Sequence, residues 1–165
     1  MSELIEEVDA DGTVVRVVTR AEMRADRLRH RAVFIAVIGS DDRLLVHRRA
    51  DDKDLWPGYW DLAAGGVVGA GEAWDDAAAR ELGEELGVSG TLEALGGATF
   101  DHPDALVVGH IYLVRHDGPF HFDDGEVTEA RFVTPSELGK LRAAHPFCPD
   151  SIALVLPRLD PRWTA

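Results

Sequence analysis

Cysteine, basic side chains and long apolar runs are all scarce in this sequence, and each scarcity excludes a class of protein. Cys148 is the single cysteine of 165 residues, so an internal disulfide cannot form and a reducing compartment is expected. Acidic residues outnumber lysine and arginine by 30 to 17, and the formal net charge of -13 repels nucleic-acid phosphates. No apolar run is long enough to span a membrane, and residues 1–12 are acidic, unlike a signal peptide. We therefore expect a cytoplasmic protein that binds neither nucleic-acid polymers nor membranes.

The length and composition of the chain fit one globular domain. Hydrophobic residues make up 45% and charged residues 28%, the balance of an ordinary soluble domain, and 165 residues can bury one core. We expect a single domain over 1–165, with an N-terminal extension at 1–30, a core at 31–145, and a C-terminal helix and tail at 146–165.

Strand and helix signals together predict an α/β fold. Residues 1–12 look acidic and turn-rich. Apolar or β-branched runs indicate strands at 13–18, 31–39, 43–49, 59–68, 91–100, 105–115 and 126–133. Caps and apolar periodicity indicate helices at 20–27, 73–86, 134–145 and 150–159, the last of them weakened or kinked by Pro157. The strand at 31–39 is expected to form a hairpin with the strand at 43–49. Strands before and after two long helices predict a sandwich in which helices cover both faces of a mixed sheet.

The helix expected at 73–86 carries a concentration of acid. Glu81, Glu84 and Glu85 stand at i, i+3 and i+4, so their carboxylates converge on one face and repel one another. A cation among them would relieve that repulsion. Oxygen ligands without thiols or nearby histidines suit Mg²⁺ or Mn²⁺ rather than zinc. The alternative is a solvated acidic face without a ligand.

The stretch around this helix resembles the signature of the Nudix hydrolase superfamily, the Nudix box, without a departure. The matching residues are Gly66, Glu72, Arg80, Glu81, Leu82, Glu84, Glu85, Gly87 and Val88. The resemblance implies a Nudix-type α/β/α sandwich and metal-dependent hydrolysis of a diphosphate linked to another moiety. It extends over most of residues 31–133, because Pro57-Gly58-Tyr59-Trp60 stands where Nudix chains commonly carry Pro-Gly-x-Trp.

Carried over by position, the resemblance assigns roles within the box and beyond it. Glu81, Glu84 and Glu85 would bind the metal, while Arg80 would brace the helix. Glu72 would either brace the loop with Arg80 or take a more distant role at the metal. The glycines Gly66 and Gly87 would hold the shape of the box. Many Nudix enzymes recruit a further glutamate from outside the box, for which we select Glu126, with Glu129 in reserve. The general base stays open between Glu81, Glu126 and His102.

Contacts to the substrate must come from outside the box. Arg48, Arg49 or Lys53 could hold a terminal phosphate. Trp56, Tyr59 and Trp60 could stack on a base or pack against an isoprenoid, although such aromatic residues serve more often as core packing. The partner expected is a small diphosphate whose remaining moiety the sequence leaves open. A homodimer is compatible with the sequence, which does not decide the oligomeric state.

Residues 28–33 (LRHRAV) and the segment before them resemble the Nudix branch that includes isopentenyl diphosphate isomerase. That branch uses a catalytic cysteine shortly after the tryptophan that corresponds to Trp60, and this chain has no thiol there. His30 matches a histidine that helps to bind metal in that branch, while Cys148 lies far along the chain. We therefore expect hydrolase chemistry on an isomerase-like architecture. The alternatives are an isomerase-like enzyme and a non-catalytic Nudix module that binds a nucleotide.

Overall fold

Strand β3 (His30–Ile38) organises the sheet of the computed structural model, which describes residues 2–164. Eight of its nine residues are buried, because neighbouring strands flank it and packed layers cover both of its faces. It pairs in parallel with β8 (Leu106–Arg115) along its whole length. On its other side it pairs antiparallel with β6 (Ala64–Val67). The sheet is therefore mixed, as predicted.

The other strands extend the sheet from this centre. At one end, β1 (Leu4–Val8) pairs with β2 (Val14–Thr19) and touches β3. β7 (Glu93–Asp101) lies beyond β8. β4 (Leu44–Arg49) pairs with β5 (Trp60–Asp61) and with β9 (Val127–Val133). Among the described residues the sheet has nine strands.

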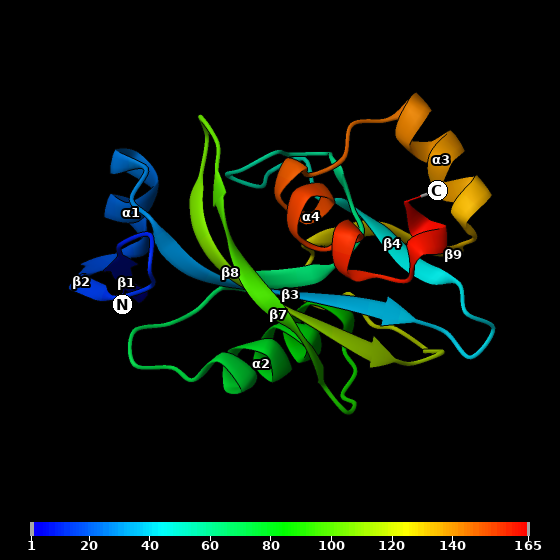
Figure 1. The fold of residues 1–165 in the computed structure, drawn as a ribbon, viewed down its shortest axis with the longest axis horizontal. Helices are drawn as coiled ribbons and strands as arrows, with labels where there is room; N and C mark the ends of the chain where they lie inside the picture. Colours follow the sequence, from blue (N-terminus) through cyan, green and yellow to red (C-terminus); the bar gives the residue numbers. More distant parts are fainter. Residues whose placement is uncertain (1, 165) are drawn as a thin grey trace.

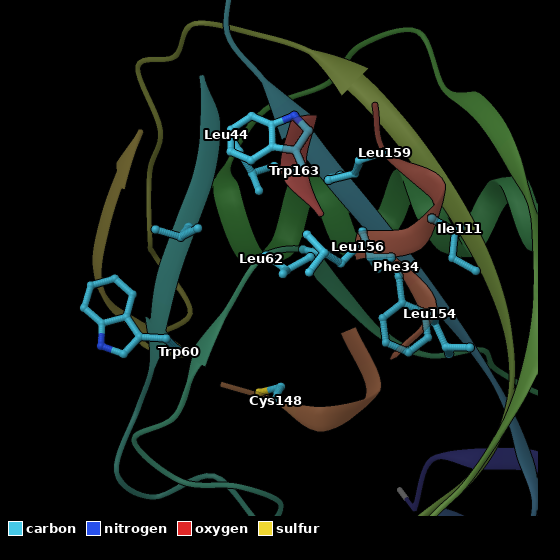
Figure 2. Packing of buried hydrophobic residues seen from close by; sticks show 14 of the residues in the cluster. Phe34, Leu44, Trp60, Leu62, Ile111, Cys148, Leu154, Leu156, Leu159 and Trp163 are labelled. Atoms are coloured by element: carbon cyan, nitrogen blue, oxygen red, sulfur yellow. The ribbon is translucent and has the colours of Figure 1, made fainter. Parts of the chain in front are cut away.

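Helices cover both faces of the sheet, which confirms the predicted α/β sandwich (Figure 1). Helix α2 (Trp74–Leu86) packs on the face that Val33, Ile35 and Val37 present. The opposite face is covered by α3 (Pro135–Ala144), α4 (Pro149–Leu154) and two short 3-10 turns, η1 (Leu156–Arg158) and η2 (Pro161–Trp163). Figure 2 shows this second layer, with Leu154, Leu156, Leu159 and Trp163 among Phe34, Leu44, Leu62 and Ile111. Within residues 2–164, no helix is long and apolar enough to cross a membrane.

The N-terminal hairpin fixes a short helix beside the central strand. Helix α1 (Arg20–Asp26) begins with a capping box, in which the Thr19 side chain accepts from the Glu22 N–H and Glu22 accepts from the Thr19 N–H. Met23 of this helix is buried against Ile5, Val18 and Val67. This small core places α1 at the side of β3 and β6, where it contributes side chains to the site described below.

The structure corrects four predictions of secondary structure. Residues 4–8 form β1 rather than a turn, because Ile5 and Val8 are buried. The acids between them, Glu6 and Glu7, form ion pairs with Arg31 and Arg16. The strand predicted at 59–68 is two strands, since β5 pairs with β4 and β6 crosses to pair with β3. The hairpin of β3 and β4 is reduced to one residue pair, Ile38↔Leu44. The last helix ends at Leu154 rather than near Leu159, and the chain continues as η1 around Pro157, where the sequence predicted a weakened or kinked helix.

Candidate active site

Helix α2 carries its acids at the border of the face that packs on the sheet. The apolar residues of α2 fix its rotation against the strands. Glu81 and Glu85 lie at the edge of that packed face and are buried, whereas the side chain of Glu84 is 54% exposed. The helix ends at Gly87, whose φ of 68° is in the left-handed region that favours glycine. Two of the three glutamates therefore point inward and one points outward.

Arg80 connects the acids of α2 to the loop before the helix. Its Nε and Nη2 donate to the two carboxylate oxygens of Glu72, each at 2.8 Å, in a bidentate fork. Nη1 donates to Glu81 Oε1 at 2.8 Å and to Glu84 Oε2 at 3.3 Å. Nη2 also reaches the carbonyl oxygen of Val67 at 3.2 Å. These are the contacts expected of a bracing residue, whose role stays a prediction.

Glu85 faces a histidine that the sequence did not single out. His47 of β4 is fully buried, and its Nε2 lies 3.3 Å from Glu85 Oε1 without the alignment of a hydrogen bond. Burial alone would lower the pKa of His47, but the Glu85 carboxylate overcomes that effect and raises it. The other oxygen of Glu85 accepts from the Gly65 N–H at 3.3 Å. Glu85 is thus held between β4 and β6.

Glu81 lies against the backbone of β6. Burial, and then the neighbouring Glu85 carboxylate, raise the pKa of Glu81 to about 7. The ionised form of Glu81 is therefore unfavourable in this position. A Cβ atom added to Gly66 would overlap the Glu81 carboxylate group. The glycine of the box therefore makes room for this side chain.

We expect Gly66→Ala to lower activity at least about tenfold, because the added methyl group displaces the Glu81 carboxylate from its position. The fold should be retained, because the Glu81 side chain can rotate away from the methyl group. Steady-state hydrolysis and the melting temperature would be measured together. Gly69→Ala is the matched control, since its Cβ would meet Glu72 at an ordinary 3.5 Å. Equal activity in the two variants would contradict the importance of the Glu81 position.

A cleft opens beside Gly65 and Gly66, on the side of the sheet away from α2. Its walls come from α1, β3, the loop at 50–58, β5, β6, the start of β8 and the segment that leads into α4. The lining side chains include Arg20, Arg24, His30, Phe34, Arg49, Lys53, Trp56, Asp61, Cys148 and Asp150. Gly65 and Gly66 connect this cleft to Glu85 and Glu81 of α2.

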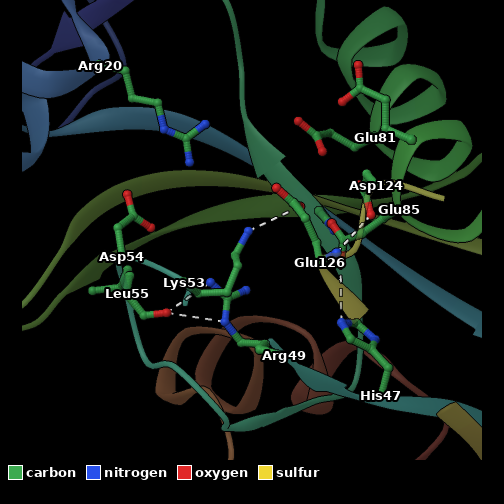
Figure 3. A network of polar contacts seen from close by, with 12 residues as sticks. Arg20, His47, Arg49, Lys53, Asp54, Leu55, Glu81, Glu85, Asp124 and Glu126 are labelled. Carbon is green, nitrogen blue, oxygen red and sulfur yellow. Dashed lines mark hydrogen bonds and ion pairs between the residues drawn. The ribbon is translucent and has the colours of Figure 1, made fainter. Parts of the chain in front are cut away.

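Four basic side chains from three segments border the cleft. Arg20 and Arg24 come from α1, Arg49 from the end of β4 and Lys53 from the following loop. Figure 3 shows Lys53 reaching Glu126, with Nζ 3.1 Å from Oε2, and Arg49 bound to the carbonyl oxygen of Leu55. Positive charge therefore stands beside the acidic face of α2, in a protein whose overall charge is negative.

The residues predicted for substrate binding are only partly brought together. Arg49 and Trp56 line the cleft, as does Lys53. Arg48 instead pairs with Asp51 at 2.7 Å, and Tyr59 is partly buried against the core; neither lines the cleft.

The other predicted residues also fall in different places. His102 stacks on Phe100 and meets the ring of Trp56 edge-on, and the general base stays open between Glu81, Glu126 and His102. His30 lines the cleft, and burial lowers its pKa to about 4.

The inner end of the cleft is acidic. Asp61 is 8% exposed, and its Oδ1 accepts from the Ser151 hydroxyl at 2.6 Å and from the Ala63 N–H at 3.2 Å. Asp150 Oδ1 accepts from the Ser151 N–H at 2.8 Å. Cys148 lies with them, and burial raises the pKa of its thiol, which therefore stays protonated. We call Asp61, Cys148 and Asp150 the floor of the cleft.

Asp150→Asn is expected to stabilise the protein more at pH 8 than at pH 4.5. Burial, and then Asp61, raise the pKa of Asp150 to about 7, against an opposing effect of Arg49. Between about pH 4 and pH 7 the unfolded chain releases a proton that the native state keeps, so native stability falls across that window. Above about pH 7 the loss of native stability caused by Asp150 is complete. Melting temperatures of both proteins across this range test the expectation, and a difference that shrinks as pH rises would contradict it.

Within residues 2–164, the structure contains no group of three or more carboxylate, histidine or cysteine side chains that is already arranged to hold a metal ion. The reason is visible at Arg80, whose guanidinium occupies the space between Glu72, Glu81 and Glu84. The donors nevertheless suit a hard divalent cation, because they are carboxylate oxygens and the buried Glu81 is poorly compensated in charge. Glu84 is exposed and held at its carboxylate only by Arg80, so it can rotate toward an ion.

Comparison with known proteins identifies the family. The model of the NUDIX domain matches residues 28–154, which is most of the chain. This protein therefore belongs to the Nudix family, and membership supports a hydrolase that acts on pyrophosphate linkages. Nudix hydrolases generally use divalent metal ions.

Among its relatives, the chain is similar to the uncharacterized Nudix hydrolase PA4841 of Pseudomonas aeruginosa, at 39% identity over 96% of this chain and 95% of that protein. It is also similar to the uncharacterized Nudix hydrolase YfcD of Escherichia coli K12, at 37% identity over 92% of this chain and 83% of that protein. The crystal structure of DR0079 from Deinococcus radiodurans superposes with a TM-score of 0.76 and 26% identity, covering 90% of this chain and 94% of that one.

Several residues of the site were missed from the sequence. Arg20 and Arg24 stand one helical turn apart, a spacing that indicates a shared face, but they precede the matched segment. Asp61 and Asp150 are 89 positions apart, and both accept hydrogen bonds from Ser151. One sequence feature could have indicated His47: it stands two positions before Arg49 in an apolar strand, so the two side chains share one face of β4.

Proposed function

We propose that this protein is a divalent-metal-dependent hydrolase that cleaves the diphosphate linkage of a nucleoside diphosphate-X type or related small molecule by attack of water on phosphorus. The observation that carries the proposal is the position of a complete acidic face on α2 next to a cleft bordered by basic side chains. One charge pattern suits metal ions and the other suits the phosphates of a substrate. The single cysteine agrees with a cytoplasmic location.

In this proposal the metal is Mg²⁺ or Mn²⁺, and Glu81, Glu84 and Glu85 hold it, with Glu126 as the ligand from outside the box. The chemistry that such an ion supplies is neutralisation of the diphosphate charge and a lower pKa for water. Arg80 keeps the α2 carboxylates in register with the glycine loop through Glu72.

The remaining work is positioning, which dominates the catalysis of phosphoryl transfer. Arg49 is fixed by Leu55, and Lys53 by Glu126, so both are held ready at the cleft to orient an anionic group. The side chain of Lys53 is only 15% exposed, so its charge is less screened by water than that of a surface lysine.

The test is a metal-dependent screen of diphosphate compounds combined with a binding measurement. We expect Mg²⁺ to raise the melting temperature, because an ion that binds only the native state stabilises it, and EDTA to reverse the rise. We expect turnover of at least one diphosphate and no turnover with EDTA. A melting temperature that rises when EDTA is added would show that the clustered acids are not a metal site.

A second candidate function, isomerisation of isopentenyl diphosphate, is favoured by one observation. The Cys148 N–H donates to the carbonyl oxygen of Trp60 at 2.8 Å, so the structure brings the only thiol to the tryptophan near the box. The raised pKa of that thiol argues against a nucleophilic or proton-shuttling thiolate at neutral pH. We therefore expect no dimethylallyl diphosphate when isopentenyl diphosphate is supplied with Mg²⁺. Its formation would favour the isomerase.

A further inference from the structure

The glutamates of the box differ in the side chain that holds them. Arg80 contacts Glu72, Glu81 and Glu84, at nitrogen–oxygen distances of 2.8, 2.8 and 3.3 Å. In the part of the chain that the structure describes, none of the hydrogen bonds or ion pairs of Arg80 reaches Glu85. Arg80 therefore does not orient the carboxylate of Glu85, which needs a different partner.

His47 is the side chain that faces Glu85. Its Nε2 lies 3.3 Å from Glu85 Oε1, and the dashed line at His47 in Figure 3 marks this contact. Within residues 2–164, no other side chain forms an ion pair or hydrogen bond with Glu85, whose second oxygen accepts from the Gly65 N–H at 3.3 Å. Both distances are long for hydrogen bonds. Glu85 therefore has His47 as its side-chain support, in a contact that is not yet tight.

The Nε2 atom of His47 has no hydrogen-bond partner. The residue is 1% exposed, and Nε2 is one of three buried side-chain nitrogen or oxygen atoms within residues 2–164 that make no hydrogen bond. A buried polar atom without a partner is costly, and folded proteins keep few of them. An apolar side chain of similar size would fill the same space without that cost. Packing alone therefore does not explain a histidine at this position.

Two strand pairings fix the backbone from which the His47 ring projects. On β4, His47 stands opposite Asp61 of β5 on one side and opposite Ala130 of β9 on the other. Leu45, two residues earlier on the same strand, packs in the core beneath α2, so His47 faces that helix as well. A ring that projects from the middle of a sheet has little freedom, whereas a glutamate side chain has several rotatable bonds. His47 can therefore fix the position of Glu85.

The contact has the chemistry of a donor and an acceptor. An ionised carboxylate only accepts, so the Nε2 atom that faces it carries a hydrogen whether or not the ring is charged. Since the atoms are 3.3 Å apart, a small change of angle and distance converts the contact into a hydrogen bond. That bond would use one lone pair of Oε1 and leave the remaining lone pairs of Glu85 for an ion.

We propose that His47 is a positioning residue of the metal site, which donates a hydrogen bond from Nε2 to Glu85 Oε1 and so fixes this carboxylate for binding a divalent cation. The inference rests on the proposed metal-dependent hydrolysis, in which Glu85 is a metal ligand. Hydrogen-bond partners of metal ligands typically contribute about ten- to a hundredfold to metal affinity or activity.

The experiment measures the dissociation constant of Mn²⁺ without substrate, by electron paramagnetic resonance of the free ion. His47→Leu removes the donor at similar volume, and His47→Asn keeps an amide that is too short to reach Glu85. Both should weaken Mn²⁺ binding at least about tenfold. His47→Gln, whose amide nitrogen reaches about as far as Nε2, should bind within about threefold of the unaltered protein.

Leu45→Ala is the matched control, because it loosens the packing of the same face of β4 without removing a donor. It should lower the melting temperature and leave the dissociation constant of Mn²⁺ unchanged. A double-mutant cycle then tests whether His47 acts through Glu85. In a Glu85→Ala background, His47→Leu should weaken Mn²⁺ binding no further.

The outcomes separate this inference from the proposed function. Binding of Mn²⁺ by His47→Leu and His47→Asn as tight as that of the unaltered protein would overturn the inference and leave the hydrolase standing. An equal loss in His47→Gln, or a full tenfold effect of His47→Leu in the Glu85→Ala background, would also overturn it. The two amide variants decide the question if His47→Leu does not fold. An unaltered protein that binds no Mn²⁺ would overturn the proposed function, and the inference with it.

Discussion

Replacing Glu84 with glutamine is expected to slow Mg²⁺-dependent hydrolysis at least about a hundredfold and to change the melting temperature by about 2 °C or less. The side chain of Glu84 is 54% exposed, and its carboxylate contacts only Arg80, so it contributes little to stability. Its proposed value lies in binding a metal. Initial rates at several Mg²⁺ concentrations, together with thermal unfolding, measure the two effects separately.

The matched control is Glu93→Gln, because Glu93 is an exposed acid at the start of β7, outside the site. Its rate should match that of the unaltered protein. A Glu84→Gln rate close to the control would exclude a metal role for this carboxylate. Glu85→Gln should also lose activity, but it disturbs the buried contact with His47 as well, and its interpretation therefore needs the stability measurement.

Replacing Arg80 with alanine is expected to lower both stability and activity. Its guanidinium carries hydrogen bonds to three carboxylates and to the backbone of β6. Since the side chain is 33% exposed, the loss should fall between that of a surface pair and that of a buried pair, about 2 kcal/mol. Chemical denaturation measures the loss, and Mg²⁺ should restore part of it by supplying positive charge among the acids.

Arg80→Lys separates charge from geometry in the same experiment. Lysine keeps the positive charge but cannot form the two-point contact with Glu72. We expect a stability between those of the alanine variant and the unaltered protein, with the loop before α2 less firmly held. A lysine variant as stable and as active as the unaltered protein would mean that charge alone matters at this position.

The parts of the fold that local patterns specify were predictable. Helix α2 has a clear apolar face and a glycine at its end, and α3 begins with a capping box and a proline, so both were placed within a residue or two. Strand β1 was not predicted because Glu6 and Glu7 interrupt the apolar pattern that its two buried residues, Ile5 and Val8, would otherwise form. The division between β5 and β6 depends on their pairing with different strands, which no local pattern encodes.

The site shows the same limit. The spacing of Glu81, Glu84 and Glu85 within one helix could be read directly, since helix geometry relates them. The contact of His47 with Glu85 depends on how β4 lies beneath α2, and the contact of Ser151 with Asp61 joins distant segments. Such encounters follow from tertiary packing. The cleft could therefore not be predicted, although the acidic face beside it could.

The position of α1 has a consequence for how this protein can change its choice of ligand. Arg20 and Arg24 stand before the matched family segment, on a helix whose one buried residue is Met23. Substitutions on the outer turns of α1 would alter the rim of the cleft without touching the helix that holds the acids. Evolution, or a protein engineer, could therefore vary recognition at the N-terminus while leaving the reaction chemistry intact.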